Sequence, residues 1–258
     1  MTGSVPPAAG DQYRDLADDY EWLVPDEHVE AEAVLDRLGD RFAARTDPTV
    51  LDCACGVGAD AVALARRGHR VWGSDGSEAM VRAARRRVAE AGVEVPLRVC
   101  RWKDLPGTFD QRFDLVLCLG NSVSHLRAEE MIVSFQGMAG VLGPGGLMVV
   151  NARNWEKLRR ERRRLTFPDR VLQRDGRRCV PLYVWSYAPE WESAHEVEII
   201  FLVDTDGSLA ARRHKLTFWP FRVGDLRDRL ETSGLRVLDD TYRTDGDWYE
   251  VVAEKPSG

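Results

Sequence analysis

The chain has 258 residues, of which 44% are hydrophobic, and a formal net charge of -6. Its length suits one large domain with an insertion or two small ones, and the acidic balance argues against a general nucleic-acid binder. No apolar run approaches the roughly 20 residues of a transmembrane helix, and the start does not resemble a secretory signal. We therefore expect a cytoplasmic protein without a membrane partner.

The first half of the chain predicts a short cap followed by an α/β core. Residues 1–10 have a composition typical of disorder, and the rest of the segment 1–44 is expected to form an N-terminal helical cap. Within it, Tyr13 and Tyr20 are seven residues apart and share one helical face. From residue 49 apolar strands alternate with helices, which predicts a parallel sheet covered by helices; the expected helices are 59–67, 77–91 and 128–141.

The second half predicts an insertion into that core. Three strand-like segments, with turns at Asp175-Gly176 and Asp206-Gly207, indicate an antiparallel β meander. We expect this inserted lid to span residues 154–221. A helix at 222–234 and two final strands then complete the core, which therefore comprises residues 45–153 and 222–258.

The stretch VLDCACGVGADAV (50–62) predicts a ligand-binding turn between a strand and a helix. Gly56 and Gly58 permit positive φ angles and expose backbone amides at the start of the helix. A G-x-G-x-x-A turn of this kind also occurs in dinucleotide-binding domains, and Asp75 lies where a ribose-binding carboxylate belongs in either case. Asp52 favours a ligand with an amino group, because its charge would repel a pyrophosphate.

The five cysteines are expected to be free thiols. Cys53, Cys55, Cys100 and Cys118 all lie in apolar, strand-like stretches, which is typical of buried thiols. Cys53 and Cys55 form a C-x-C pair, but two further ligands of a zinc site are missing. No metal is expected.

A set of five motifs resembles the class I S-adenosylmethionine-dependent methyltransferases. In chain order they are VLDCACGVG, WGSD, RWKDLP, FDLVLCLG and GPGGLMVV. The resemblance favours a methyltransferase over a nicotinamide oxidoreductase, and it implies a Rossmann-like sheet and S-adenosylmethionine as cofactor. It also implies roles for the matched residues. Asp52, Gly56 and Gly58 would bind the methionine end of the cofactor, and Asp75 would bind the ribose. Met80, Trp102 and Asp104 would flank the adenine. Ala54 and Leu119 lie in the same motifs and are also assigned to cofactor binding.

Further matches resemble glycine N-methyltransferase and the glycine/sarcosine methyltransferases. They are ACGxGxD at 54–60, LCLGNS at 117–122 and an Arg-Asn pair at 153–154. By this resemblance Arg153 binds the carboxylate of an amino acid substrate and Asn121 helps to fix that substrate. Tyr13 and Trp22 belong to the segment that covers the cofactor.

The chain also departs from that family around the substrate. Pro25 stands where the family has a substrate-side tyrosine, and Trp155 replaces a tyrosine after the Arg-Asn pair. These changes suggest a reshaped pocket. Three tyrosines are candidates to supply the missing hydroxyl, namely Tyr20, Tyr183 and Tyr187, and we place Tyr20 in the catalytic set. His125 is as well suited to bonding a backbone carbonyl as to acting as a base, so it is left out.

Three functional hypotheses follow. The leading one is methylation of the amine of a small carboxylate-bearing substrate, and the second is O- or C-methylation of a larger natural product. The third is a non-catalytic, cofactor-dependent nucleic-acid-binding protein that uses the basic run KLRRERRR (157–164) as its contact surface, although such a run is more often a solvated helix face. The expected partner is a small-molecule substrate without nucleic acid, and a homo-oligomer is left open.

Overall fold

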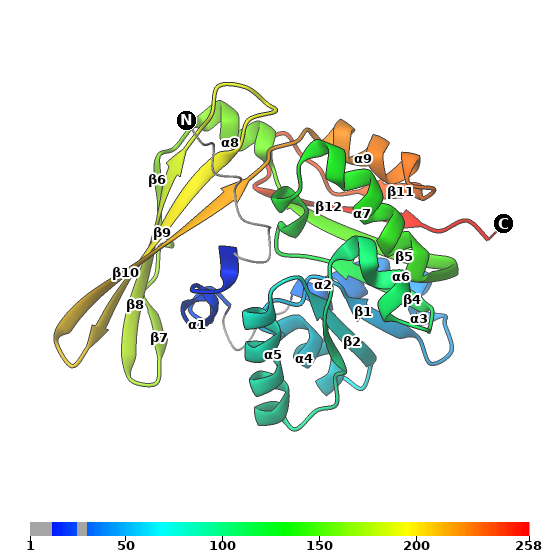
Figure 1. Ribbon diagram of the computed structural model, residues 1–258, viewed down its shortest axis with the longest axis horizontal. Coiled ribbons are helices and arrows are strands. Elements are labelled where there is room, and N and C mark those ends of the chain that lie inside the picture. Colours follow the sequence, from blue (N-terminus) through cyan, green and yellow to red (C-terminus); the bar gives the residue numbers. More distant parts are fainter. Residues whose placement is uncertain (1–11, 25–29, 258) are drawn as a thin grey trace.

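The computed structural model describes residues 12–24 and 30–257, and Figure 1 shows a large sheet flanked by helices with a second sheet beside it. The predicted disordered start at 1–10 and Pro25 lie outside the described residues. The strands of the large sheet are β1 (Thr49–Asp52), β2 (Arg70–Asp75), β3 (Leu97–Val99), β4 (Phe113–Cys118), β5 (Leu142–Arg153), β11 (Arg236–Asp240) and β12 (Trp248–Glu254).

The loops that follow the parallel strands of the large sheet lie together at the carboxyl ends of these strands. Its strands lie in the order β11-β12-β5-β4-β1-β2-β3. Strands β1 to β5 pair in parallel, whereas β12 pairs antiparallel with both β5 and β11. The strand order reverses between β1 and β4, and ligands of such sheets bind at the carboxyl ends of the strands at this point. The expected Rossmann-like fold is confirmed.

Helices cover both faces of this sheet. They are α2 (Glu30–Leu38), α3 (Asp40–Ala43), α4 (Ala59–Arg66), α5 (Glu78–Ala91), α6 (Leu105–Thr108), α7 (Ala128–Val141) and α9 (Val223–Thr232). Val50 and Leu115 pack in one core cluster with α2, α4 and α5. Their chain neighbours Leu51 and Val116 pack in the other, with α6, α7 and α9. Because both faces are buried, the strands are almost continuously apolar.

The insertion forms the second sheet, seen beside α1 (Ala17–Tyr20) in Figure 1. It follows α8 (Trp155–Glu161) and comprises β6 (Leu165–Thr166), β7 (Leu172–Arg174), β8 (Arg177–Ser186), β9 (His195–Thr205) and β10 (Ser208–Phe218). Alternate residues of β9 are buried, as expected for a strand with one face on a core.

The expectation of three strands in the insertion is wrong in one respect. The Asp175-Gly176 turn joins β7 to β8, so it divides the first predicted segment into a hairpin. The short strand β6 pairs with β8 as well. Asp175 and Gly176 both have positive φ, the conformation that a two-residue hairpin turn requires.

The five cysteines are all free and buried, as the sequence predicts. Within the described parts of the chain, no group of three or more His, Cys, Asp or Glu side chains is placed to hold a metal ion. In the same residues no helix is both long and apolar enough to cross a membrane.

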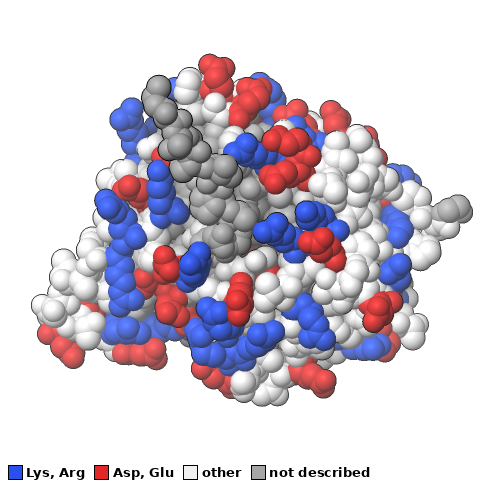
Figure 2. Space-filling model, viewed as in Figure 1, with Lys and Arg blue, Asp and Glu red and all other residues white. Residues whose placement is uncertain are grey.

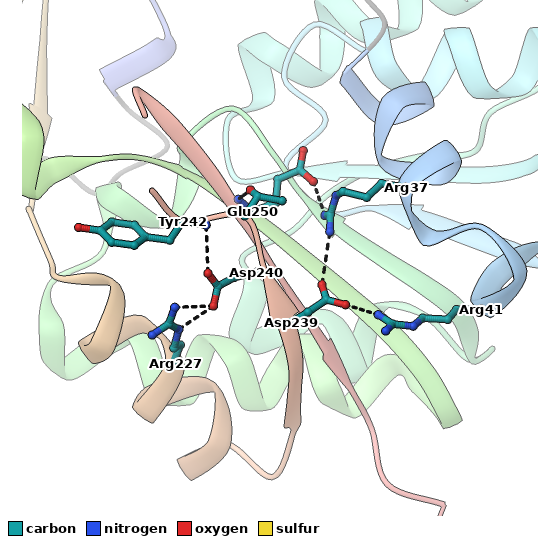
Figure 3. A network of polar contacts seen from close by, with 8 residues as sticks. Arg37, Arg41, Arg227, Asp239, Asp240, Tyr242 and Glu250 are labelled. Atoms are coloured by element: carbon teal, nitrogen blue, oxygen red, sulfur yellow. Dashed lines mark hydrogen bonds and ion pairs between the residues drawn. The ribbon is translucent and has the colours of Figure 1, made fainter. Parts of the chain in front are cut away.

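Ion pairs fasten the two C-terminal strands to helices from elsewhere in the chain (Figure 3). Arg37 and Arg41, on α2 and α3, both pair with Asp239 on β11. Arg227 on α9 pairs with Asp240, its Nε lying 2.8 Å from a carboxylate oxygen. Exposed pairs of this kind stabilise a fold by only about 0–1 kcal/mol each. They therefore contribute little to the overall stability of the fold.

Gly137 is expected to be essential for packing α7 against the 3₁₀ turn η2 (Trp102–Asp104). A Cβ at this position would overlap the backbone carbonyl of Trp102, which has no flexible side chain to move aside. Gly137→Ala should therefore lower the free energy of unfolding by about 1–3 kcal/mol, the usual cost of overpacking. Gly107→Ala is the control, because a Cβ there would have no atom within 4 Å. Equal stability of the two variants in urea denaturation would contradict this account.

Candidate active site

The glycine turn at the end of β1 has the geometry that the sequence predicts. Gly56 and Gly58 have φ angles of +50° and +81°, and Gly58 is the N-cap of α4. A Cβ at Gly58 would lie only 3.0 Å from that of Ala84 on α5. The amide of Gly56 donates to a carboxylate oxygen of Asp75 at 3.0 Å, and the amide of Ser77 donates to the other oxygen at 2.8 Å. Asp75 therefore holds the turn against the end of β2.

Asp52, at the end of β1, is buried, with only 2% of its surface exposed. Burial, together with the nearby carboxylates of Asp60 and Asp75, raises the pKa of Asp52 well above its usual value. Burial raises the pKa of Asp75 in the same direction. An anionic ligand would add to this repulsion, whereas a cationic group would relieve it. The carboxylates thus fit the ammonium and sulfonium of S-adenosylmethionine and do not fit the pyrophosphate of a dinucleotide.

Tyr20 lies between the glycine turn and the substrate side of the site. A Cβ added to Gly56 would lie 4.0 Å from Cε1 of the Tyr20 ring, so the ring is next to the glycine turn. Its pKa is raised by burial and by Tyr183 and Asp75, and is lowered by Arg153, so all three groups are close enough to interact with it electrostatically. Tyr20 is consequently a neutral phenol at physiological pH. Its oxygen can accept one hydrogen bond and donate another.

Tyr13 is tied to the core by His125. The Tyr13 hydroxyl lies 2.6 Å from Nε2 of His125, and Nδ1 of this ring lies 3.1 Å from the carbonyl oxygen of Thr217. A carbonyl can only accept, so Nδ1 carries the proton and Nε2 accepts from Tyr13. Burial lowers the pKa of His125 to about 4, which keeps it neutral. His125 bonds a backbone carbonyl, as the sequence analysis suggested.

The cap is also fastened to the inserted sheet. Asp19 of α1, only 3% exposed, accepts from Arg212 at 2.6 Å and lies 2.8 Å from His214, both on β10. Glu21 pairs with Arg174 of β7 at 2.8 Å. These contacts hold the Tyr13–Tyr20 segment beneath the insertion. Tyr13 and Tyr20 face one another with ring centroids 5.7 Å apart, although they lie in two short turns and not in one continuous helix.

The residues predicted on the adenine side occupy different environments. Trp102 is half-buried, and its indole Nε1 donates to the carbonyl of Cys53 at 2.7 Å, next to the glycine turn. Met80 is only 1% exposed and packs with Val57 and Ala83. Asp104 is exposed. Of the other residues predicted to bind the cofactor, Trp22 and Leu119 are buried and Ala54 is half-buried.

Asn121 joins the end of β4 to the end of β5. It is buried with a φ of +60°, and its Oδ1 accepts from the backbone amide of Arg153 at 3.0 Å. Its Nδ2 donates to Ser124 at 2.7 Å. Asn121 therefore positions the backbone of Arg153. A direct contact between Asn121 and a substrate stays a prediction.

Arg153 lies at a cavity of about 300 Å³ between the cap and the insertion. Its guanidinium stacks on Trp248 at 4.5 Å and on Trp185 at 5.9 Å. The nearby Asp247 pairs instead with Lys157 at 2.9 Å, so no carboxylate among the described residues forms an ion pair with Arg153. Burial lowers the pKa of Arg153. A half-buried guanidinium that forms no ion pair with a described carboxylate favours an anionic ligand.

The structure narrows the choice among the candidate tyrosines. Tyr183 lines the cavity of Arg153 and raises the pKa of Tyr20. The hydroxyl of Tyr187 is engaged by the carbonyl of Arg163 at 3.0 Å. Trp155, which we expected to reshape the pocket, is instead part of the core, 1% exposed, and packs against Trp185.

Several cavity residues were missed by the sequence analysis. Phe167, Leu172 and Thr166 belong to the insertion, where no motif marks them. Trp248 lies directly opposite Arg153 in the antiparallel pair of β12 and β5. Only the register of those strands would have revealed this pair, and that register is not evident from the sequence.

Much of the basic run 157–164 is engaged within the protein. Besides the ion pair of Lys157, Arg159 donates to the carbonyls of Ala188 and Pro189 and stacks on Trp191. Arg160 donates to the carbonyl of Thr244 at 2.9 Å. These bonds tie α8 to the insertion and to the loop before β12.

Comparisons with known proteins agree with this geometry. Residues 50–146 match a family model described as a methyltransferase domain. The whole chain is similar to a crystal structure of an S-adenosylmethionine-dependent methyltransferase from Clostridium acetobutylicum, with a TM-score of 0.74, 16% identity, and coverage of 95% of this chain and 99% of that one. This chain has the class I methyltransferase fold.

Two further relatives resemble the chain within this fold. Human glycine N-methyltransferase is 32% identical over 123 residues, which is 42% of either chain. The S-adenosylmethionine-bound amino pentose methyltransferase from Micromonospora echinaspora has a TM-score of 0.70 and 22% identity, covering 93% of this chain and 96% of that one. The chain spans about two fifths of the length of the curated relatives first matched.

Asp52→Asn should weaken binding of S-adenosylmethionine about 10- to 100-fold, because a charge-assisted hydrogen bond is lost. The raised pKa of Asp52 adds a pH dependence. Wild-type binding should weaken as the pH falls, beginning at a higher pH than an exposed aspartate would require, because this carboxyl becomes protonated, whereas Asp52→Asn lacks that contribution. Isothermal calorimetry measures both effects. Asp18→Asn, at an exposed carboxylate of the cap, is the control, and an unchanged affinity in Asp52→Asn would refute the assignment.

Acid should destabilise the protein through His125. The unfolded histidine takes up a proton below about pH 6.5, whereas the buried ring resists until about pH 4. The unfolded state thus binds more protons between these values, and the free energy of unfolding decreases as the pH falls through them. Urea denaturation of His125→Gln should show a smaller decrease than the wild type. His69→Gln, at a partly exposed ring, should keep most of it.

Proposed function

We propose that this protein transfers a methyl group from S-adenosylmethionine to the amine nitrogen of a small, carboxylate-bearing substrate. The observation that carries the proposal is the guanidinium of Arg153, which faces a cavity without a carboxylate partner among the described residues. Tyr20 connects this cavity to the glycine turn. The name of the human relative, glycine N-methyltransferase, supports the same substrate chemistry.

The protein's own groups account for most of what this reaction needs. When bound, the cofactor supplies a methyl group already activated on a sulfonium. Arg153 holds the substrate carboxylate through paired hydrogen bonds, which orients the amine. Asn121 keeps the backbone of Arg153 in place. Fixing a neutral amine in line with the transferred methyl group and excluding water are the main catalytic contributions expected here.

Tyr20 is proposed to act on the amine. Because burial keeps its phenol neutral, its oxygen can accept a hydrogen bond from the amine and thereby turn the nitrogen lone pair toward the methyl group. The bound cofactor would supply the methyl group to this nitrogen and leave as S-adenosylhomocysteine, and the resulting ammonium would release its proton to solvent. The ion pair between Asp19 of α1 and Arg212 of β10 keeps Tyr20 at the site.

O- or C-methylation of a larger natural product is the second candidate. The size of the cavity and the similarity to an amino pentose methyltransferase favour a larger substrate and do not indicate which atom is methylated. Release of S-adenosylhomocysteine across a panel of glycine, sarcosine, larger amino acids, phenols and aromatic acids separates the two. Turnover of phenols together with rejection of every amino acid would select the second candidate.

The nucleic-acid-binding alternative has less support. The basic run that it requires is largely bonded to carbonyls and carboxylates of this chain. Figure 2 shows acidic side chains interspersed with basic ones over the face that it displays. Steep, salt-dependent binding to RNA would nevertheless favour this alternative.

Arg153→Lys should raise the KM for the amine substrate about 10- to 100-fold, because lysine cannot make the paired hydrogen bonds of a guanidinium. Cofactor affinity should not change. Arg159→Lys is a matched control, since Arg159 also stacks on a tryptophan but lies outside the cavity. Steady-state kinetics with calorimetry measures both quantities. Loss of cofactor binding in Arg153→Lys would show that Arg153 belongs to the cofactor site instead.

A further inference from the structure

We propose that the substrate carries, besides its carboxylate and amine, a branched or aromatic apolar body that fills the cavity of Arg153. This inference rests on the proposed function and concerns the same site. It assigns a specificity role to Phe167, Leu172 and Trp22, three residues that line the cavity from the insertion and from the cap.

The cavity is too large for glycine. Its volume is about 300 Å³. Glycine has five non-hydrogen atoms, and about 10–15 Å³ of such a cavity holds one water molecule, so glycine would fill only about a quarter of that space. The remaining space would hold water against apolar side chains, which is unfavourable. A substrate with several additional carbon atoms would displace that water.

The lining has one charged end and an apolar wall. Most lining residues are apolar, namely Trp22, Leu23, Phe167, Pro168, Leu172 and Pro181. The cationic residues are Arg153 and the exposed Arg170, and the described residues of the lining include no Asp or Glu. Small-molecule sites typically combine an apolar wall with a few polar groups that set the orientation of the ligand. Here Arg153 would bind the carboxylate and the wall would receive the apolar body.

Two large apolar side chains near Arg153 are exposed. Phe167, which lines the cavity, is 60% exposed, and Trp248, which stacks on Arg153, is 42% exposed. Both are therefore accessible to a ligand bound at Arg153. An apolar body extending from Arg153 would cover Phe167.

The inserted sheet and the cap provide the wall together. Leu172 and Tyr183 come from β7 and β8, and Trp22 follows α1. The ion pair between Glu21 and Arg174 holds these two elements together beside the cavity. The apolar wall is therefore built by tertiary contacts, and it lies next to Tyr20 at the proposed reaction centre.

The test measures binding of carboxylates that have no amine, so it does not depend on turnover. Protein saturated with S-adenosylhomocysteine is titrated with acetate and with 3-phenylpropionate in a calorimeter. We expect 3-phenylpropionate to bind at least tenfold more tightly, because burying a phenyl ring is favourable by that order. Phe167→Ala should reduce the ratio to about threefold or less.

Leu209→Ala is the matched control. Leu209 is also an exposed apolar residue of the insertion, at 70% exposure, but it lies on β10 and does not line the cavity. The ratio in this variant should equal that of the wild type. Equal affinity of the wild type for the two carboxylates would overturn the proposal. A ratio that Phe167→Ala leaves unchanged would overturn it too.

Failure of this inference can be told apart from failure of the proposed function. If acetate and 3-phenylpropionate bind equally while amines are methylated, only the apolar body is refuted. If both carboxylates bind as tightly to Arg153→Met as to the wild type, the carboxylate site itself is wrong, and the proposed function fails with it. Weaker binding of both carboxylates to Arg153→Met, together with a preference for 3-phenylpropionate that Phe167→Ala reduces to about threefold or less, supports both.

Discussion

Two neighbouring carboxylates at the ends of adjacent strands, Asp52 buried and Asp75 half-buried, are the constraint on which this site depends. Asp52 and Asp75 are held near one another under the glycine turn, and their pKa values are raised because burial disfavours their charge. Backbone amides of Gly56 and Ser77 satisfy Asp75, and Ala54 donates to Asp52. The arrangement therefore favours a ligand that brings positive charge to the turn.

The substrate side of the site carries a positive charge. Arg153 places a half-buried positive charge, stacked on tryptophans, beside a cavity with a mostly apolar lining. The carboxylates at the glycine turn suit a cationic cofactor, and Arg153 suits an anionic substrate. Tyr20 is affected electrostatically by both sides, since Asp75 raises its pKa and Arg153 lowers it. The neutral phenol lies where methyl donor and acceptor are proposed to meet.

Enclosure of the site depends on contacts between segments far apart in the sequence. Asp19 binds Arg212 and His214, and the side chain of Gln12 accepts from the amide of Thr217 at 2.6 Å. Figure 1 shows α1 between the inserted sheet and the large sheet. Because the carboxylate of Asp19 is buried, its two basic partners are needed to offset the cost of removing it from water. Cap and insertion therefore act as one cover.

The sequence by itself determined the order of strands and helices in the α/β core, the glycine turn, the buried thiols and the carboxyl-end positions of Asp52 and Asp75. These features depend on local patterns, namely periodic apolar residues and glycines that need positive φ. Only the tertiary structure decided that Trp248 stacks on Arg153, that Asn121 holds the Arg153 backbone and that Trp155 is core. Those contacts join residues far apart in the sequence, and no hairpin turn connects β5 to β12 to set the register that pairs Arg153 with Trp248.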